Sequence, residues 1–414
     1  MNDRLASLPS TVPPVPLSAH ALRVALFTHS VNPRGGVVHT LELARALHDE
    51  GCDVTVFAPA AQGETMFRDT PCRVVLARVT DRPANTVAMV ETRIAALRRA
   101  LLDVLLERGA AHFDILHAGD SISGNALAQL KEEGHIAGFV RTVHHLDVFD
   151  DLRLEHWQRR AWHDADVVLC VSDAWAQRMQ RDHGVAALTV PNGVDVERFC
   201  TAPADEDHAV RQRLGITKEG GPVVLAVGGV EARKNTLMLL EAFARLRQTA
   251  PAAQLVIAGG ASLLDHDAYA RQFAARAAAC GLRIGRGAAV VLTGTVDDAD
   301  MPALFRSADV VAMVSVREGF GLVVLEALAC GRPVVVSRIA PFTEYLDERV
   351  CVWANPLDAE SIAGALRRAL HARGGIDFTQ AVPALLDRFN WAASARCHLQ
   401  IYGAWLAGRR LAVR

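Results

Sequence analysis

Short apolar runs of five to seven residues alternate along the chain with longer segments in which apolar residues recur every three or four positions. Continuous runs rich in valine and leucine are typical of parallel strands buried on both faces, and the longer spacing is typical of amphipathic helices. In the first half, strands are expected at 22–27, 53–58, 73–77, 114–118, 139–145 and 166–172. In the second half, they are expected at 222–228, 254–260, 289–294, 309–315 and 332–337.

The strand–helix alternation occurs twice, which predicts an α/β protein of two doubly wound, Rossmann-like domains facing each other across a cleft. A turn-rich PNGVDVERF segment and an acidic TAPADEDHAV segment separate the two halves. We expect a flexible N-terminal tail (1–20), a first Rossmann-like domain (21–191), an interdomain linker region (192–221), a second Rossmann-like domain (222–384) and a C-terminal helix that returns to the first domain (385–414). Functional residues are expected on loops that follow strands, because doubly wound sheets bind ligands there.

Composition limits the classes of function. Of the 414 residues, 51% are hydrophobic and 22% charged, as in folded proteins with a large core. A net charge of -2 gives no global attraction to nucleic acid, so no nucleic-acid partner is expected. The eight cysteines show no C-x-x-C spacing, which predicts a reduced cytoplasmic location. No stretch reaches the ~18–20 apolar residues of a membrane span, and the nearly balanced charges of helix 91–109 do not indicate peripheral membrane contact.

The strongest chemical signal is the segment REGFGLVVLEALACG, which follows the expected strand 309–315. Gly319 and Gly321 stand at an expected helix start, where backbone N–H groups and partial positive charge can bind phosphate. Glu326 lies within the first two turns, so its carboxylate can reach the hydroxyls of a ligand such as a ribose diol. Glu318 stands just before the helix and could hold another hydroxyl pair. A structural Glu326 paired with a buried arginine is the alternative, and the glycines with the second glutamate favour ligand binding.

Two further loops carry candidate phosphate contacts. Gly35 and Gly36 stand between the first expected strand and a helix, without the G-x-G-x-x-G fingerprint of dinucleotide-binding proteins. A doubled glycine at that position favours anion contact over a simple tight turn. In the second half, Arg233 and Lys234 precede another helix and would neutralise a diphosphate there, whereas in isolation they would be interpreted as a solvated charge pair.

Two adjacent histidines end the expected strand 139–145. His144 and His145 are followed closely by Asp147. A lone histidine after a buried strand is commonly a core residue, but a pair at the cleft side favours a ligand contact for one of them.

Taken together, these segments resemble glycosyltransferase family 4, of the GT-B architecture, from about residue 22 to the C-terminal helix. The most specific element is EGFGLVVLE at 318–326, which is similar to the family's E-x7-E signature, followed by ALACGRPVVVS. Supporting elements are the glycine loop, the strand ending in His144, VSDAW at 171–175, PNGVD at 191–195 and the GTVDDADMPALFRSADVV stretch.

The resemblance implies a retaining transfer of sugar from a nucleotide-diphosphate sugar to a glycan, lipid or small-molecule acceptor. It implies catalytic roles for His144, Lys234 and Glu318. It implies donor binding by Gly35, Gly36, Arg233, Gly319, Phe320, Gly321, Leu322 and Glu326. It implies that the second domain (222–384) binds most of the nucleotide sugar. It implies that the first domain (21–191) binds the acceptor, for which the candidate contacts are Asp120, His145 and Asp147. The family's arginine after the first strand of the second domain is replaced by Gly229, and Arg233 is the candidate substitute.

No metal or other cofactor is expected to be required. Aspartate pairs in D-x-D spacing hold a metal ion in the other glycosyltransferase architecture, and this chain contains such pairs. One of them, Asp298 and Asp300, is interpreted as capping a helix that starts near Met301. The alternatives to a transferase are a GT-B-fold sugar-nucleotide epimerase, a non-catalytic nucleotide-sugar-binding protein, a glycogen-phosphorylase-like enzyme and an NAD(P)-dependent oxidoreductase. The sequence shows no cofactor lysine site of the kind that a glycogen-phosphorylase-like enzyme needs. The absent dinucleotide fingerprint counts against an NAD(P)-dependent oxidoreductase.

Overall fold

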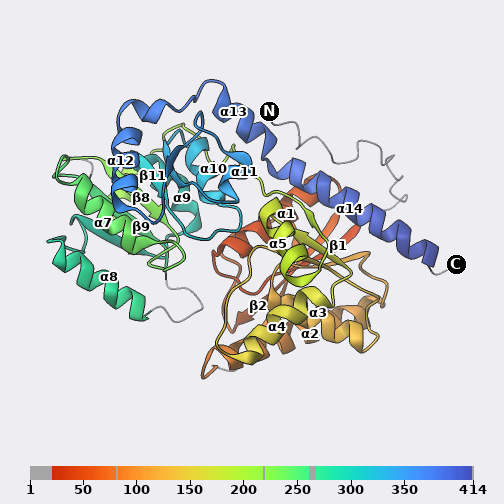
Figure 1. Ribbon diagram of the computed structural model, residues 1–414. Coiled ribbons are helices and arrows are strands. Elements are labelled where there is room, and N and C mark those ends of the chain that lie inside the picture. The colour runs from red at the N-terminus through yellow and green to blue at the C-terminus, as the bar shows by residue number, and fades with distance from the viewer. Residues whose placement is uncertain (1–20, 81–82, 218–219, 261–266, 413–414) are drawn as a thin grey trace.

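The computed structural model describes residues 21–80, 83–217, 220–260 and 267–412. The tail expected at 1–20 lies outside the described residues. The chain forms two parallel β-sheets, each with helices packed against it, which confirms the predicted architecture of two Rossmann-like domains (Figure 1).

The first domain is built on a seven-stranded sheet of order β3-β2-β1-β4-β5-β6-β7, in which every neighbouring pair is parallel. Its strands are β1 (Arg23–Phe27), β2 (Asp53–Ala61), β3 (Arg73–Val79), β4 (Ile115–Ala118), β5 (Val140–Val143), β6 (Val167–Cys170) and β7 (Ala187–Thr189). Its helices are α1 (Gly35–Asp49), α2 (Thr86–Arg108), α3 (Ser121–Glu132), α4 (Leu152–His163) and α5 (Asp173–His183).

The second domain carries a six-stranded parallel sheet of order β10-β9-β8-β11-β12-β13. Its strands are β8 (Val223–Val227), β9 (Gln254–Ala258), β10 (Val290–Gly294), β11 (Val310–Met313), β12 (Val334–Ser337) and β13 (Val352–Ala354). The helical segments from the linker region onward are α6 (Asp207–Leu214), α7 (Thr236–Leu246), α8 (Asp267–Ala279), η1 (Asp298–Asp300), α9 (Met301–Ser307), α10 (Leu322–Ala329), α11 (Phe342–Tyr345), α12 (Ala359–Leu370), η2 (Ala372–Gly375), α13 (Ala381–Arg388) and α14 (Trp391–Ala412).

The central strands are the continuous apolar runs of the sequence. Every residue of β4, β5, β11 and β12 is buried, because helices cover both faces of a parallel sheet. The sequence analysis does not predict β7 and β13, which stand at the edges of their sheets and span three residues each. Runs of three residues are too short to show the strand pattern.

Each sheet has one point at which the strand order reverses, between β1 and β4 in the first domain and between β8 and β11 in the second. Successive connections leave in opposite directions there, which opens a crevice beyond the carboxyl ends of the strands. The loops that carry the predicted site residues all start at these strand ends or at the end of β5.

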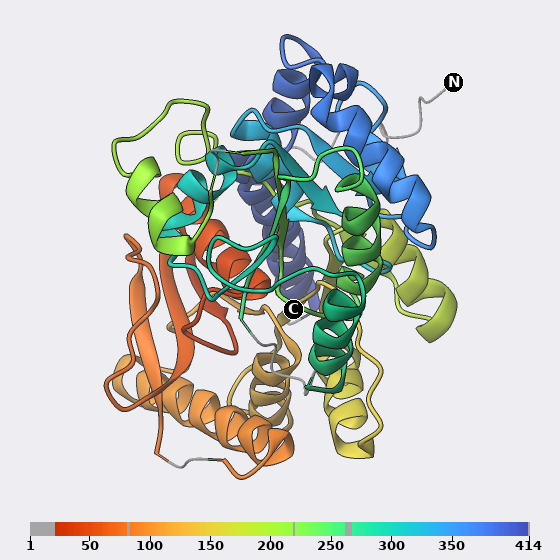
Figure 2. The same cartoon turned by 90° about the vertical axis from the view of Figure 1, so that its left-hand side faces the viewer.

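The C-terminal helix crosses back to the first domain. Trp391, Ala395 and Tyr402 of α14 are buried in a core cluster with residues of β1, α1 and β2, and both views show α14 running beside α1 (Figures 1 and 2). The linker meets the start of α14, where a Cβ on Gly193 would lie 2.2 Å from the carbonyl carbon of Asn390, so only glycine fits. None of the described helices is long and apolar enough to cross a membrane.

Candidate active site

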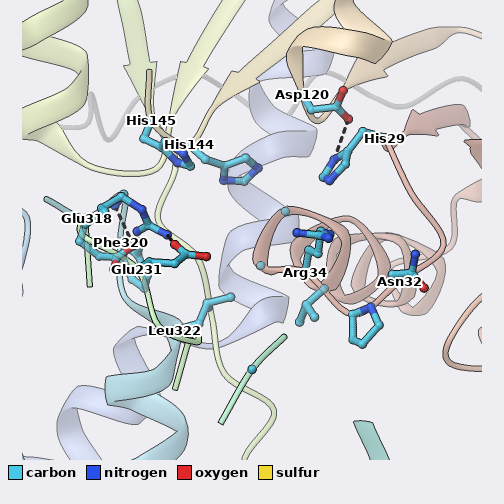
Figure 3. Close-up of a pocket in the computed structure, with 18 of the residues that line it drawn as sticks. His29, Asn32, Arg34, Asp120, His144, His145, Glu231, Glu318, Phe320 and Leu322 are labelled. Carbon is cyan, nitrogen blue, oxygen red and sulfur yellow. Dashed lines mark hydrogen bonds and ion pairs between the residues drawn. The ribbon is translucent and has the colours of Figure 1, made fainter. Parts of the chain in front are cut away.

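A cavity of about 970 Å³ lies between the two domains, at the carboxyl ends of both sheets. Its walls are the loops after β1, β4 and β5 on one side and after β8 and β11 on the other (Figure 3). All fourteen residues predicted for donor, acceptor and catalytic roles line it. The structure therefore brings the predicted site together in one place, and the roles of the individual residues stay predictions.

Glu318 is the centre of an ion cluster on the second-domain wall. Its carboxylate lies 3.0 Å from Nη1 of Arg233 and 2.8 Å from Nζ of Lys234, and it accepts a hydrogen bond from the Gly319 N–H at 3.2 Å. Its side chain is 11% exposed. Burial alone would raise the pKa of Glu318, but Lys234 and Arg233 outweigh it and lower the pKa to about 2. Both cations predicted for the diphosphate thus pair with Glu318 in this structure.

The glycines before this cluster have a packing reason. A Cβ on Gly228 would lie 2.6 Å from Cε of Lys234, and a Cβ on Gly229 would lie 2.8 Å from the carbonyl oxygen of Gly260. Gly229 also has a positive φ of 75°. No arginine fits at position 229 in this packing, so the absence of the family's arginine follows from close contact between the loops after β8 and β9.

Gly319 brings the E-x7-E loop against the first domain, whereas Gly321 packs against Phe342 of α11 in the second domain. A Cβ on Gly319 would lie 2.4 Å from the carbonyl oxygen of His144. Gly321 precedes α10 with a φ of 96°, in the left-handed region. Phe320 lines the cavity but is only 4% exposed. Its ring packs on Tyr345 at a centroid distance of 5.0 Å, and its carbonyl oxygen accepts a hydrogen bond from the Tyr345 hydroxyl at 2.8 Å, so the residue belongs largely to the core.

Glu326 lies on α10 beside an ion network that joins the domains. Burial raises the pKa of Glu326 to about 7; Arg198 acts against the rise, and Glu42 and Asp298 add to it. The carboxyl group therefore takes up or releases a proton close to neutral pH, and it can donate or accept hydrogen bonds to hydroxyl groups.

The network corrects one expectation from the sequence. Asp298 and Asp300 do not cap α9, whose N-terminus has no side-chain cap hydrogen bond. Asp298 instead accepts from Nε and Nη2 of Arg68 at 2.6 and 2.8 Å and lies 2.9 Å from Arg198. Asp300 pairs with Arg213 at 2.5 Å. Arg68 also pairs with Glu42 of α1, so Asp298 holds the second domain to the first. These aspartates make ion pairs because the folded chain places arginines opposite them.

His144 and His145 point to different partners. His144 faces Gly36, whose missing Cβ would lie 3.8 Å from its Cδ2, whereas Nε2 of His145 lies 3.4 Å from Asp147. Burial lowers the pKa of His144 well below its usual value, and Arg141 adds to the shift, so the ring is neutral. His39 packs edge-on to His144 at 4.6 Å between ring centroids.

His39 is held in turn by Asn192, at 2.9 Å between Nδ1 and the amide oxygen. The sequence analysis missed His39 and Asn192. His39 lies outside the motifs named above, Asn192 belongs to PNGVD at 191–195 but has no role assigned to it there, and the two residues are 153 positions apart in the chain.

Asp120 caps α3 through Oδ1, which accepts from the Ser123 N–H at 2.9 Å. Its Oδ2 lies 3.6 Å from Nδ1 of His29, as the dashed line in Figure 3 marks. Burial would raise the pKa of Asp120, but His29 and the Ser123 N–H outweigh it and lower the pKa. Asp120 is therefore a carboxylate on the first-domain wall. Among the described residues, no group of three or more His, Cys, Asp or Glu side chains is placed to hold a metal ion.

Two family models match the chain. The model described as Glycosyltransferase Family 4 matches residues 33–198, and the model described as Glycosyl transferases group 1 matches residues 210–379. A D-inositol 3-phosphate glycosyltransferase from Salinispora tropica is 29% identical, over 91% of this chain and 82% of its own. Mannosylfructose-phosphate synthase from Agrobacterium fabrum is 24% identical, over 79% of this chain and 76% of its own.

Solved structures share the fold. Sucrose-phosphate synthase from Thermosynechococcus elongatus superposes with a TM-score of 0.74 at 22% identity, covering 94% of this chain and 100% of that chain. Anabaena Alr3699/HepE, solved in complex with UDP and glucose, superposes with a TM-score of 0.71 at 19% identity, covering 92% of this chain and 100% of that chain.

Two Rossmann-like domains with a cavity between them, together with these matches, define the chain as a glycosyltransferase of the GT-B architecture. It belongs to glycosyltransferase family 4.

Proposed function

We propose that the protein is a retaining, metal-independent glycosyltransferase, which moves a sugar from a nucleoside-diphosphate sugar to a hydroxyl group of an acceptor. The observation that carries this proposal is the partly buried cluster of Glu318, Arg233 and Lys234 in the cavity between the domains. A nucleotide-sugar donor is further supported by the likeness to Alr3699/HepE, solved with UDP and glucose. The free cysteines agree with our proposal that the enzyme works in a reducing cytoplasm.

Donor binding would rearrange the ion cluster. A diphosphate carries more negative charge than one carboxylate, so it would take Lys234 and Arg233 from Glu318. Glu318, with the N–H groups from Gly319 to the start of α10, would then hold hydroxyls of the transferred sugar. Glu326 would hold the ribose hydroxyls from the next turn of the same helix.

The first domain would close over the donor. Gly35 and Gly36 present the backbone at the start of α1, and nothing lies within 4 Å of the missing Cβ of Gly35, so a phosphate has room to approach. His144, neutral and opposite Gly36, would contact the sugar near the reacting carbon. Asp120, His145 and Asp147 line the same wall and are the candidate acceptor contacts.

In the proposed reaction the bond between the anomeric carbon and the diphosphate oxygen breaks, and a bond to the acceptor oxygen forms on the same face. The acceptor proton passes to the departing phosphate oxygen, so no protein base is required. Lys234 and Arg233 stabilise the negative charge that develops on the leaving group. Losing one such donor typically costs ~10²–10³ in rate.

The test is to incubate the protein with UDP-, GDP- and ADP-sugars and candidate acceptors, and to measure the release of nucleoside diphosphate. We expect acceptor-dependent release with one nucleotide, unchanged by a chelator, and a fall of ~10²-fold in Lys234→Ala. Lys131→Ala is the matched control, because Lys131 also pairs with a carboxylate at 2.9 Å but lies outside the cavity.

Three results would contradict the proposal. Failure of every nucleotide to stabilise the protein or turn over would exclude donor binding. Conversion of the donor without transfer would favour the epimerase alternative. Loss of activity in chelator would contradict metal independence.

A further inference from the structure

The first-domain wall of the cavity carries more positive than negative charge. Arg34 precedes α1 and Arg141 lies on β5, and both line the cavity together with the carboxylate of Asp120. Arg93 of α2 stands close behind, donating from Nη1 to the carbonyl oxygen of His29 at 3.0 Å. Asp120 attracts both Arg93 and Arg141, and Arg34 repels Arg93. The guanidinium groups of Arg93 and Arg141 are therefore attracted by the same carboxylate, whereas Arg34 is attracted by Glu231 of the second domain.

Arg141 is less compensated than Arg93, which donates to the carbonyl oxygen of His29 and is also attracted by Glu64. Arg141 is 3% exposed, and its Nε and Nη1 atoms have no hydrogen-bond partner among the described residues. Burial lowers the pKa of Arg141 to about 10, so the group still carries its charge at neutral pH. A buried charge without a paired counter-ion is costly, and natural proteins keep one chiefly where a ligand supplies the partner.

The nearest carboxylate does not fill this role. Asp120 is engaged by Ser123 through Oδ1 and faces His29 at 3.6 Å through Oδ2, which itself lacks a hydrogen bond among the described residues. Within the described part of the chain, no ion pair joins Arg141 to Asp120. Among the described residues, the guanidinium group of Arg141 thus has no ion-pair partner, and beside it Oδ2 of Asp120 has no hydrogen-bond donor.

We propose that this wall binds an oxyanion of a substrate, a phosphate or a carboxylate, with Arg141 as its principal counter-charge. The inference rests on the proposed function and names the class of substrate. A hydroxyl beside the oxyanion would donate to Oδ2 of Asp120, which suits a sugar or polyol phosphate as acceptor. The same chemistry could come from the carboxylate of a uronic acid as the transferred sugar, since His144 adjoins Arg141 on the same strand end.

The test uses the full chain and three variants: Arg141→Met, Arg141→Lys and, as a control, Arg159→Met, which removes an exposed arginine outside the cavity. The nucleoside diphosphate that most raises the Tm is added to saturation, so that the diphosphate site is filled. Inorganic phosphate is then titrated at constant ionic strength by calorimetry. We expect saturable binding to wild type and to Arg159→Met, and binding at least about tenfold weaker in Arg141→Met, since hydrogen bonds to charged groups contribute that much or more.

The Tm without ligand separates binding from folding. A structural Arg141 would lower the Tm when replaced by methionine, whereas an uncompensated buried charge leaves the Tm unchanged or raises it. In a second arm, wild type and Arg141→Met are compared with a nucleotide glucuronate against the matching nucleotide glucose. If wild type prefers the nucleotide glucuronate and Arg141→Met loses this preference, the oxyanion belongs to the donor. If wild type binds phosphate but shows no preference for the glucuronate, the oxyanion belongs to the acceptor.

The outcomes separate this inference from the proposed function. If no nucleoside diphosphate stabilises the protein, the proposed function fails and this inference fails with it. If a nucleotide stabilises the protein but neither phosphate nor glucuronate binding depends on Arg141, the proposed function stands and the oxyanion site is refuted.

Discussion

Replacing Glu318 by glutamine removes one charge from the ion cluster while keeping the shape of the side chain. Glu318 is the shared partner of Arg233 at 3.0 Å and Lys234 at 2.8 Å, and its side chain is 11% exposed. Removing one partner of a buried pair typically costs about 3–5 kcal/mol, and the open cavity places this site near the lower end. A loss of about 3 kcal/mol corresponds to a Tm lower by about 6–12 °C for a domain of this size.

The same substitution should strengthen the binding of free nucleoside diphosphate. In the unliganded protein Glu318 competes with a diphosphate for both cations, and glutamine does not. We expect Glu318→Gln to bind nucleoside diphosphate about tenfold more tightly, equivalent to about 1.4 kcal/mol, and to turn over donor at least ~10²-fold more slowly. Lys234→Ala should instead bind the nucleotide more weakly, so the two variants move affinity in opposite directions.

The assays are thermal unfolding, calorimetry with the nucleoside diphosphate, and steady-state kinetics. Glu360→Gln is the matched control, because Glu360 also pairs with two arginines, at 3.2 and 2.6 Å, but is 56% exposed. Exposed pairs contribute about 0–1 kcal/mol, so its Tm and nucleotide affinity should hardly change. Weaker nucleotide binding by Glu318→Gln, or a Tm change no larger than that of the control, would refute the competition between Glu318 and the diphosphate.

Three further predictions follow from the cavity walls and the buried histidines. Asp298→Asn removes the anion shared by Arg68 and Arg198, so the donor KM should rise several-fold with little change in kcat; an unchanged KM would show that the network does not hold the domains closed. Gly36→Ala should leave the Tm unchanged but weaken donor binding about tenfold, because its methyl group faces His144 across 3.8 Å, whereas Gly319→Ala, with a 2.4 Å contact, should lower the Tm; equal Tm values would contradict this packing. Burial lowers the pKa of four histidines below 6.5: His39, His117, His144 and His398. Below about pH 6.5 the unfolded chain therefore binds more protons than the folded chain. The free energy of unfolding should fall on acidification by up to ~1.4 kcal/mol per pH unit for each histidine. Glu326, with its pKa raised to about 7, opposes this by losing stability as pH rises from 4.5 through 7, so urea unfolding at about pH 7.5 and pH 5.5 should give the lower stability at the lower pH.

The sequence carries most of the fold and the part of the site that lies in continuous motifs. Central strands are predictable because both of their faces are buried, which leaves an unbroken apolar run. Gly319, Gly321 and the two glutamates are predictable because one loop and one helix turn fix their spacing. Edge strands β7 and β13 are missed because three residues carry no period.

Contacts between distant segments could not be predicted in the same way. Arg68 meets Asp298 across 230 positions of the chain, so no local pattern separates an interdomain ion pair from a helix cap. His39 and Asn192 support His144 only because the linker returns beneath α1. The uncompensated charge of Arg141 could not be predicted from the sequence either. The segment RTVHH shows that a strand carries an arginine, but the partners of that arginine are set by the fold.

The most direct measurement is a crystal structure with the nucleoside diphosphate that stabilises the protein. We predict that the phosphates contact Arg233 and Lys234 in place of Glu318, and that the ribose hydroxyls contact Glu326. A nucleotide bound outside the cavity between the domains, or phosphates distant from an intact Glu318–Lys234 pair, would contradict the proposed donor site.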